Sequence, residues 1–301
     1  MNSDSDAAVA RNLLWMSPTL VEKVSTSKVT VVGCGGAGAI FATYAAHLGF
    51  RRLTLCDNDS LDESNFNRYP IALTAHIGRP KVLVVKEYLE ARFNDLELHA
   101  ISEHFPNHRV CEEVQTSDFV VGCLDTVLPR IELDIYCRKY GTLLMDLGTG
   151  FAMSESGEEV LVSGGQILLS RPGGACLRCL GFDVEGTKNN YFVPSSDAPE
   201  PSSLLLNAVV GALAVECSLG IVSESVLSNR IEYDRGTMSI VKHTLDGKPN
   251  CTICGGIVVA MGGTRRELRE CGRRRVVRET LHGQTSKLTA GSDAGCSATK
   301  A

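Results

Sequence analysis

A glycine-rich turn early in the chain is of the kind that binds phosphate groups. Its four glycines are Gly33, Gly35, Gly36 and Gly38, and three of them give the spacing G-x-G-x-x-G between an apolar run at 28–33 and a helical stretch ending near residue 48. Glycines there permit a tight turn and close backbone approach, and amides at a helix start can bind phosphate. Asp57 ends the next apolar run, where a carboxylate can accept hydrogen bonds from a ribose. The pattern favours nucleotide binding rather than a purely structural turn. It does not distinguish a dinucleotide ligand from ATP.

Two cations and a carboxylate further along the chain favour ATP. Arg68 and Lys81 follow the second apolar run, and Asp125 ends the run at 119–124. An enzyme that adenylates a carboxylate needs cations for the triphosphate and the leaving pyrophosphate, and a carboxylate for Mg²⁺. A dehydrogenase needs none of these. Each residue also has a structural explanation: Arg68 as a solvated loop charge, Lys81 as a surface lysine, and Asp125 as a helix cap.

Four cysteines have the spacing of a zinc site. They form two C-x-x-C pairs: Cys176 with Cys179, and Cys251 with Cys254. Each turn can direct two thiolates at one ion, and two turns complete a closed tetrahedral shell of the structural kind. The alternative is two separate redox or buried pairs.

Short apolar runs alternate with helical patterns through the first half of the chain. Strands are predicted at 28–33, 53–57, 96–101, 119–124 and 143–146, with helices at about 36–48, 80–93 and 128–140. This alternation predicts a Rossmann-type, largely parallel sheet with helices on both faces. After Gly148 we expect a smaller antiparallel, zinc-stapled part. Its predicted elements are two paired strands at 159–162 and 166–169 joined by a glycine-rich turn, a surface crossover loop at 181–202, a buried apolar helix at 204–222, and strands at 230–234 and 238–244.

Composition limits the function classes. The 301 residues are 44% hydrophobic and 22% charged, which favours a packed core, and the net charge of -5 argues against nucleic acid as the main partner. No run approaches the roughly 20 apolar residues of a membrane span, and the polar, acidic start is unlike a secretory signal. We therefore expect a cytoplasmic protein whose 12 cysteines are buried thiols, metal ligands or catalysts in preference to disulfides. Four segments are predicted: an N-terminal helical arm at 1–27, an ATP-binding Rossmann-like half at 28–150, a substrate half with the crossover loop and zinc site at 151–261, and a basic tail at 262–301.

Over roughly residues 8–258 the sequence resembles the ThiF/MoeB family, whose fold is shared with the adenylation domains of ubiquitin-activating enzymes. The matching motifs are the glycine loop, Asp57-x-Asp59, Ser64-Asn65-Phe66-Asn67-Arg68, Gly78-x-Pro80-Lys81 and the strand ending in Asp125. The resemblance implies that Asp57, Asp59 and Asn65 hold the nucleotide. It also implies that Arg68 and Lys81 contact phosphates, that Asp125 binds Mg²⁺, and that the four cysteines bind zinc.

Two places differ from the family pattern. Arg11-Asn12 stands where the family has an Arg-Gln motif, whose arginine reaches the triphosphate of the partner subunit, so the resemblance implies a catalytic Arg11 and a homodimer. Tyr69-Pro70 replaces the usual glutamine after the arginine, which can reshape the phosphate end of the site.

The resemblance implies ATP-dependent adenylation of the C-terminal glycine carboxylate of a ubiquitin-like or sulfur-carrier protein, with a conjugating or sulfur-transfer protein downstream. Alternatives are a peptide or tRNA-linked carboxylate, a non-catalytic nucleotide-binding scaffold, or an NAD-dependent oxidoreductase, whose nicotinamide-side groups we do not find. Residues 180–202 contain no cysteine for a thioester, and Cys271, flanked by arginines that would lower its pKa, is the remaining candidate.

Overall fold

The computed structural model describes residues 11–154, 159–182, 201–225 and 227–255, all within the compact unit Met1–Gly262. Their strands form one eight-stranded sheet in the order β3-β2-β1-β4-β5-β6-β7-β8. The strands are β1 Lys28–Val32, β2 Arg52–Cys56, β3 Glu97–Ile101, β4 Phe119–Gly122, β5 Leu143–Met153, β6 Val160–Ser170, β7 Arg230–Asp234 and β8 Ser239–His243. Strands β1 to β5 pair in parallel, and β6, β7 and β8 add antiparallel neighbours. The predicted fold class is confirmed.

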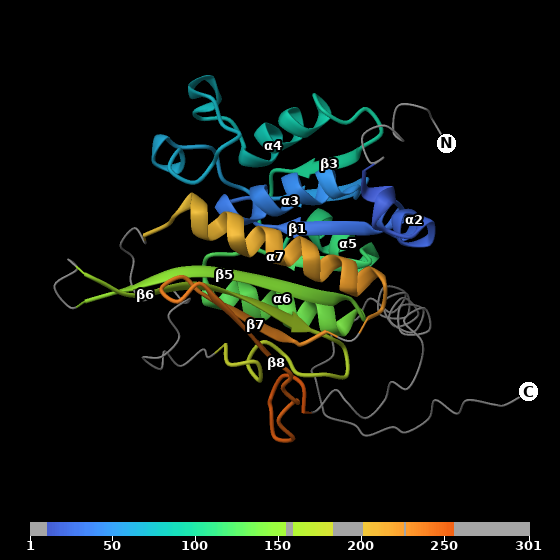
Figure 1. The fold of residues 1–301 in the computed structure, drawn as a ribbon, viewed down its shortest axis with the longest axis vertical. Coiled ribbons are helices and arrows are strands. Elements are labelled where there is room, and N and C mark those ends of the chain that lie inside the picture. The colour runs from blue at the N-terminus through green and yellow to red at the C-terminus, as the bar shows by residue number, and fades with distance from the viewer. Residues whose placement is uncertain (1–10, 155–158, 183–200, 226, 256–301) are drawn as a thin grey trace, which may run out of the picture. The chain divides into compact units, whose positions relative to one another are not determined.

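Helices cover both faces of the sheet. The helical elements are η1 Asn12–Leu14, α2 Pro18–Thr26, α3 Gly36–Leu48, η2 Glu63–Asn65, η3 Thr74–His76, α4 Lys81–Glu90, α5 His108–Thr116, α6 Val127–Lys139 and α7 Leu204–Val222. One hydrophobic core joins α2, α3, α4 and α7 to the sheet, and a second joins α5, α6 and the cysteine turns to its other face. Figure 1 shows α3 and α7 side by side in front of the sheet, with α5 and α6 behind it. Strand β1 is buried on both faces, as its continuous apolar run predicts.

The two strands expected at 159–162 and 166–169 are one continuous strand, so the predicted glycine-rich turn between them is wrong. β6 runs through both glycines of that segment and pairs with β5 along its length. Gly165 faces α7, and a Cβ on it would lie 2.1 Å from Cγ2 of Val210. The glycine is needed because the helix approaches the strand closely there, not because the chain turns.

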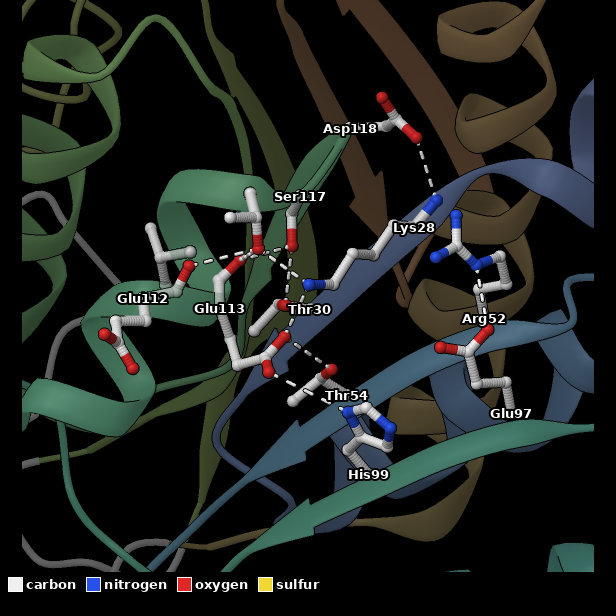
Figure 2. A network of polar contacts seen from close by, with 12 residues as sticks. Lys28, Thr30, Arg52, Thr54, Glu97, His99, Glu112, Glu113, Ser117 and Asp118 are labelled. Carbon is white, nitrogen blue, oxygen red and sulfur yellow. Dashed lines mark hydrogen bonds and ion pairs between the residues drawn. The ribbon is translucent and has the colours of Figure 1, made fainter. Parts of the chain in front are cut away.

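Helix α5, between β3 and β4, was not predicted from the sequence. Its buried residues Val110 and Val114 are one helical turn apart, which is the only apolar periodicity that such a short segment offers. A polar network fixes its C-terminal end to the sheet (Figure 2). Glu113 of α5 accepts a hydrogen bond from Thr54 of β2 at 3.1 Å and forms an ion pair with Lys28 of β1 at 2.8 Å.

Helix α7 is long and apolar enough to cross a membrane by length and composition alone, with a mean hydropathy of 2.0. Half of that stretch is buried within the chain, and its buried side includes Leu206, Val210 and Ala214. The core helix of a globular protein can have the same length and composition, and the structure confirms the predicted buried helix at 204–222.

The predicted segments compare with the structure as follows. Segment 1–27 contributes η1 and α2 to the described residues, and β5 crosses the predicted boundary at 150/151. The tail at 262–301, with Cys271, lies outside the described residues.

Replacing Glu113 with glutamine should lower the free energy of unfolding by about 1 kcal/mol at pH 7, because glutamine cannot form the ion pair with Lys28. Burial raises the pKa of Glu113, but the hydrogen bond and charge of Lys28 and the hydrogen bond of Thr54 outweigh it, so the pKa lies below its ordinary value. Such a carboxylate stabilises the fold above its unfolded-state pKa, and this stabilisation is lost as pH falls through the folded-state pKa. The difference between wild type and variant should therefore shrink between about pH 5 and pH 3 in urea unfolding.

Glu112→Gln is the matched control. This neighbour has a side chain 62% exposed, and its ion pair with His108 at 3.6 Å lies on the surface. Surface pairs contribute little, so the control should unfold like wild type. Equal stability of the two variants at pH 7 would contradict the role given to Glu113.

Candidate functional site

A cleft of about 760 Å³ opens at the carboxyl ends of β1, β2 and β4, beside the middle of β5. This is the edge at which parallel α/β sheets bind ligands. Eight of the residues predicted for the site line it together: Gly33, Gly35, Gly36, Asp57, Asp59, Arg68, Lys81 and Asp125. Gly38, Asn65 and Arg11 do not line it. The volume is that of a small-molecule site.

The glycine loop closes against bare backbone. Gly33 has φ +94°, which favours glycine, and a Cβ on it would lie 2.5 Å from the carbonyl oxygen of Cys123. A Cβ on Gly38 would lie 2.0 Å from the carbonyl oxygen of Gly33. Gly38 therefore acts behind the cleft, where it lets the first turn of α3 pack on the loop. The N-terminus of α3, with Gly35 and Gly36, is left facing the cleft as a place for phosphate.

Asp57 fixes the shape of the loop around it. Its Oδ2 accepts the backbone N–H of Cys34 at 2.6 Å, and its Oδ1 accepts that of Asp59 at 2.7 Å. Burial raises the pKa of this carboxyl, while the two backbone hydrogen bonds and the nearby charge of Lys81 act in the opposite direction. Each oxygen retains acceptor capacity toward the cleft, which suits the hydroxyl groups of a ribose.

The two predicted phosphate-binding cations reach the cleft from different segments. Lys81 begins α4, its side chain is 12% exposed, and its Nζ lies 2.7 Å from Oδ2 of Asp59. It is therefore not a solvated surface lysine. Arg68 donates to the carbonyl of Ser64 at 2.9 Å and to Oδ1 of Asn67 at 3.0 Å. Among the described residues Arg68 has no carboxylate partner, so its charge can serve an anion in the cleft.

Asp125 is exposed and lies three residues after the end of β4. The N-cap of α6 is Thr126, and no side chain caps that helix start. Within the described ranges Asp125 makes no hydrogen bond or ion pair through its side chain. The capping role considered from the sequence is thus not what the structure shows. A carboxylate that lines the cleft without a protein partner can bind a hydrated divalent cation.

Several cleft residues were not predicted. Arg130 of α6 is buried, pairs with Asp146 of β5 through two nitrogens, and has its guanidinium carbon 4.2 Å from the centre of the Phe182 ring. Asn207 of α7 accepts a hydrogen bond from Thr149 of β5 at 2.8 Å. The only sequence signals were an arginine inside a predicted helix and an asparagine inside an apolar one. Neither signal indicates which residue the side chain will contact in the folded protein.

Three residues associated with the site lie elsewhere. Asn65 is 7% exposed and forms a capping box with Asp62 at the start of η2. Tyr69 is buried beneath α4 and donates to the carbonyl of Lys81 at 3.3 Å. Arg11 is exposed beside η1, and its action on a partner subunit stays a prediction, as does the nucleotide contact of Asn65.

The four cysteines of the two C-x-x-C pairs meet at one point. Their sulfur atoms all lie within 4.8 Å of one another, with 3.5 Å between Cys176 and Cys251 and between Cys179 and Cys254. A tetrahedral zinc with bonds of about 2.3 Å separates its sulfurs by about 3.8 Å, so the cluster fits that ion. The 3.5 Å contacts are far too long for disulfides. Burial raises the pKa of Cys251, but backbone N–H groups and neighbouring thiols outweigh it and lower the pKa to about 6.

Helix α6 connects the cleft with the cysteine turns. Arg130, Asp134 and Arg138 lie at four-residue intervals on it, and all three are buried. Asp134 accepts the N–H of Leu177, inside the first C-x-x-C turn, at 2.8 Å, and Arg138 donates to the carbonyl of Gly174 at 3.0 Å. One face of this helix is therefore bonded to the cleft at one end and to the cysteine turn at the other.

Two glycine substitutions test the geometry of the loop. Gly38→Ala should lower the free energy of unfolding by about 1–3 kcal/mol, because the added carbon meets backbone that cannot move aside. Gly35→Ala is the matched control, since a Cβ there meets nothing within 4 Å. Urea unfolding of both variants gives the comparison, and equal stabilities would show that α3 does not depend on this contact.

Comparison with known proteins identifies the family of this chain. The sequence pattern of the ThiF family matches residues 9–254. The sulfur carrier protein ThiS adenylyltransferase of Escherichia coli is 26% identical over 250 residues, or 78% of this chain and 88% of that protein. The SAMP-activating enzyme E1 of Haloferax volcanii is 25% identical over 246 residues, which are 77% of this chain and 82% of that protein. The crystal structure of E. coli MccB with MccA-N7isoASN has the same fold, with a TM-score of 0.68 and 21% identity. The match covers 83% of this chain and 74% of the MccB chain. The chain therefore belongs to the ThiF family and is an ATP-dependent adenylyltransferase of the E1-like kind.

Proposed function

We propose that this chain adenylates the C-terminal glycine carboxylate of a ubiquitin-like or sulfur-carrier protein. The observation that carries the proposal is the meeting of the glycine loop, Arg68, Lys81 and Asp125 in one cleft. The names of the relatives from E. coli and H. volcanii support this class of substrate. A conjugating or sulfur-transfer protein would then receive the activated acyl group.

The reaction joins a carboxylate oxygen to the α-phosphorus of ATP and breaks the bond to pyrophosphate. No nucleophilic side chain is needed, so positioning and neutralisation of charge supply the catalysis. Arg68 and Lys81 stabilise the negative charge that moves onto the pyrophosphate. Lys81 can do so by exchanging Asp59 for a phosphate, since the acid is 55% exposed and can turn toward water. Asp125 would hold Mg²⁺, which supplies further neutralisation when bound.

The ends of the nucleotide are assigned to different sides of the cleft. Asp57 and Asp59 lie at the end of β2 and face the ribose, and the start of α3 faces the phosphates. Arg11 would reach the triphosphate of a second subunit, which makes the active form a homodimer. An enzyme with these residue roles would work in the cytoplasm, where it meets ATP and a soluble carboxylate protein.

Another acceptor is a second candidate. The related structure of MccB was solved with MccA-N7isoASN, so the same fold accommodates that substance. A peptide or tRNA-linked carboxylate would use the same cleft and the same cations. Measuring ATP–pyrophosphate exchange with each class of carboxylate distinguishes these candidates.

ATP–pyrophosphate exchange is the direct test of the reaction. Exchange should depend on a ubiquitin-like protein ending in glycine, and Asp125→Ala or Lys81→Ala should lower its rate by about 10²-fold or more. Lys86→Ala is the matched control, because Lys86 lies on the same helix but contacts Leu98 of β3, away from the cleft. Exchange that is absent with every glycine-terminated protein, or that is equal in all variants, would reject the proposal.

The cysteine cluster should hold one zinc ion per chain, with a structural role. Cys179→Ser should remove the ion and lower the melting temperature, since binding of a structural zinc contributes several kcal/mol to folding. Cys111→Ser is the control, because Cys111 is half-buried and lies outside the cluster. Metal content by mass spectrometry and thermal unfolding give the readouts. Stoichiometric zinc in the Cys179→Ser protein would show that the ion binds elsewhere.

A further inference from the structure

Asn207 places a polar side chain inside the cleft from an otherwise apolar helix. It lies in the first turns of α7, is 2% exposed, and lines the cleft together with Gly36 and Thr149. Its neighbours along the helix are leucine, alanine and valine. A buried amide in such a helix weakens the core unless its donor and acceptor are both used.

Half of that requirement is met within the protein. The hydroxyl of Thr149 donates to Oδ1 of Asn207 at 2.8 Å. This hydrogen bond occupies the amide oxygen and fixes the plane of the amide. Nδ2 donates to no residue in the part of the chain that the structure describes. Nδ2 is open to the cleft, so a bound ligand would shut it off from water, and a donor left without an acceptor there would cost about 1–3 kcal/mol. A ligand oxygen that accepts from Nδ2 avoids this cost.

The position of Nδ2 indicates which ligand oxygen it meets. A Cβ on Gly36 would lie 2.3 Å from Nδ2 and 3.3 Å from the carbonyl oxygen of Arg68. Nδ2 therefore lies over the first residue of α3, where the helix start attracts phosphate. Its partner Thr149 belongs to β5 and also lines the cleft. The amide thus lies between the start of α3 and β5.

We infer that Asn207 is a substrate-binding residue whose side-chain amide donates to an anionic oxygen at the reacting centre. That oxygen belongs to the α-phosphate or to the carboxylate that becomes joined to it. Thr149 is the positioning residue that directs Nδ2 toward this oxygen. The inference rests on the proposed function, because it assigns a donor to the acyl adenylate formed in the same cleft.

Asn207→Asp is the variant that separates binding from structure. Aspartate has nearly the same size and still accepts the hydroxyl of Thr149, but it replaces the amide donor with a negative oxygen. Calorimetric titration should show at least tenfold weaker binding of AMP and unchanged binding of adenosine, which has no phosphate. If AMP is unaffected and only glycyl-sulfamoyl adenosine, a stable analogue of glycyl adenylate, binds at least tenfold more weakly, the oxygen belongs to the carboxylate. Both results support the inference.

Two further variants keep the test decisive. Asn207→Ser, which is too short to reach over Gly36, should also weaken binding of the phosphate or acyl-sulfamate probe, and it replaces Asn207→Asp if that protein does not fold. Thr149→Val leaves the amide donor in place and should weaken binding less than Asn207→Asp does. Unchanged affinity of the folded Asn207 variants for all three probes would overturn this inference alone, while a wild-type protein that binds neither ATP nor AMP would overturn the proposed function as well.

Discussion

The structure depends on close contact between bare backbone segments at the carboxyl end of β1. Gly33 lies against the carbonyl of Cys123 after β4, and Gly38 packs α3 against Gly33 itself. Asp57 completes this arrangement from β2 by accepting the N–H of Cys34. Because side chains are excluded there, three neighbouring parallel strands end within reach of one helix start. The cleft is what remains between them, so nucleotide binding follows from the same packing that closes the fold.

The antiparallel part of the sheet completes the cleft from the opposite side. β5 leaves the parallel half and pairs along its length with β6, whose glycine at 165 lets α7 approach. Helix α7 then packs beside α3 and brings Asn207 over Gly36. Residues separated by more than 150 positions in the chain thus meet at one helix start. Neither half of the chain forms this wall of the cleft alone.

Features with local causes could be predicted from the sequence, and features set by distant neighbours could not. The parallel strands, α3 and the glycine loop follow from apolar runs and spacing within a few residues, and the pairing of the four cysteines follows from two short turns. β6 was divided wrongly because glycines at 164 and 165 resemble a turn, whereas Val210 of α7 is what requires the second one. Helix α5 has two buried valines and is bonded to residues distant in the sequence, among them Lys28 and Thr54. Arg130 and Asn207 have roles only because of Asp146 and Thr149, which no local pattern connects to them.

The buried charged face of α6 makes the cysteine cluster part of the geometry of the nucleotide cleft. Arg130, Asp134 and Arg138 give the helix bonded contacts at both ends, and Asp125 lies directly before its first turn. A rigid helix held in this way cannot rotate at one end only. Opening of the cysteine turns would therefore displace Asp125 and Arg130 at the other end of the helix. A metal held by the cysteines would therefore be coupled to the cleft, and by thermodynamic linkage occupancy of each site would change the affinity of the other by the same factor.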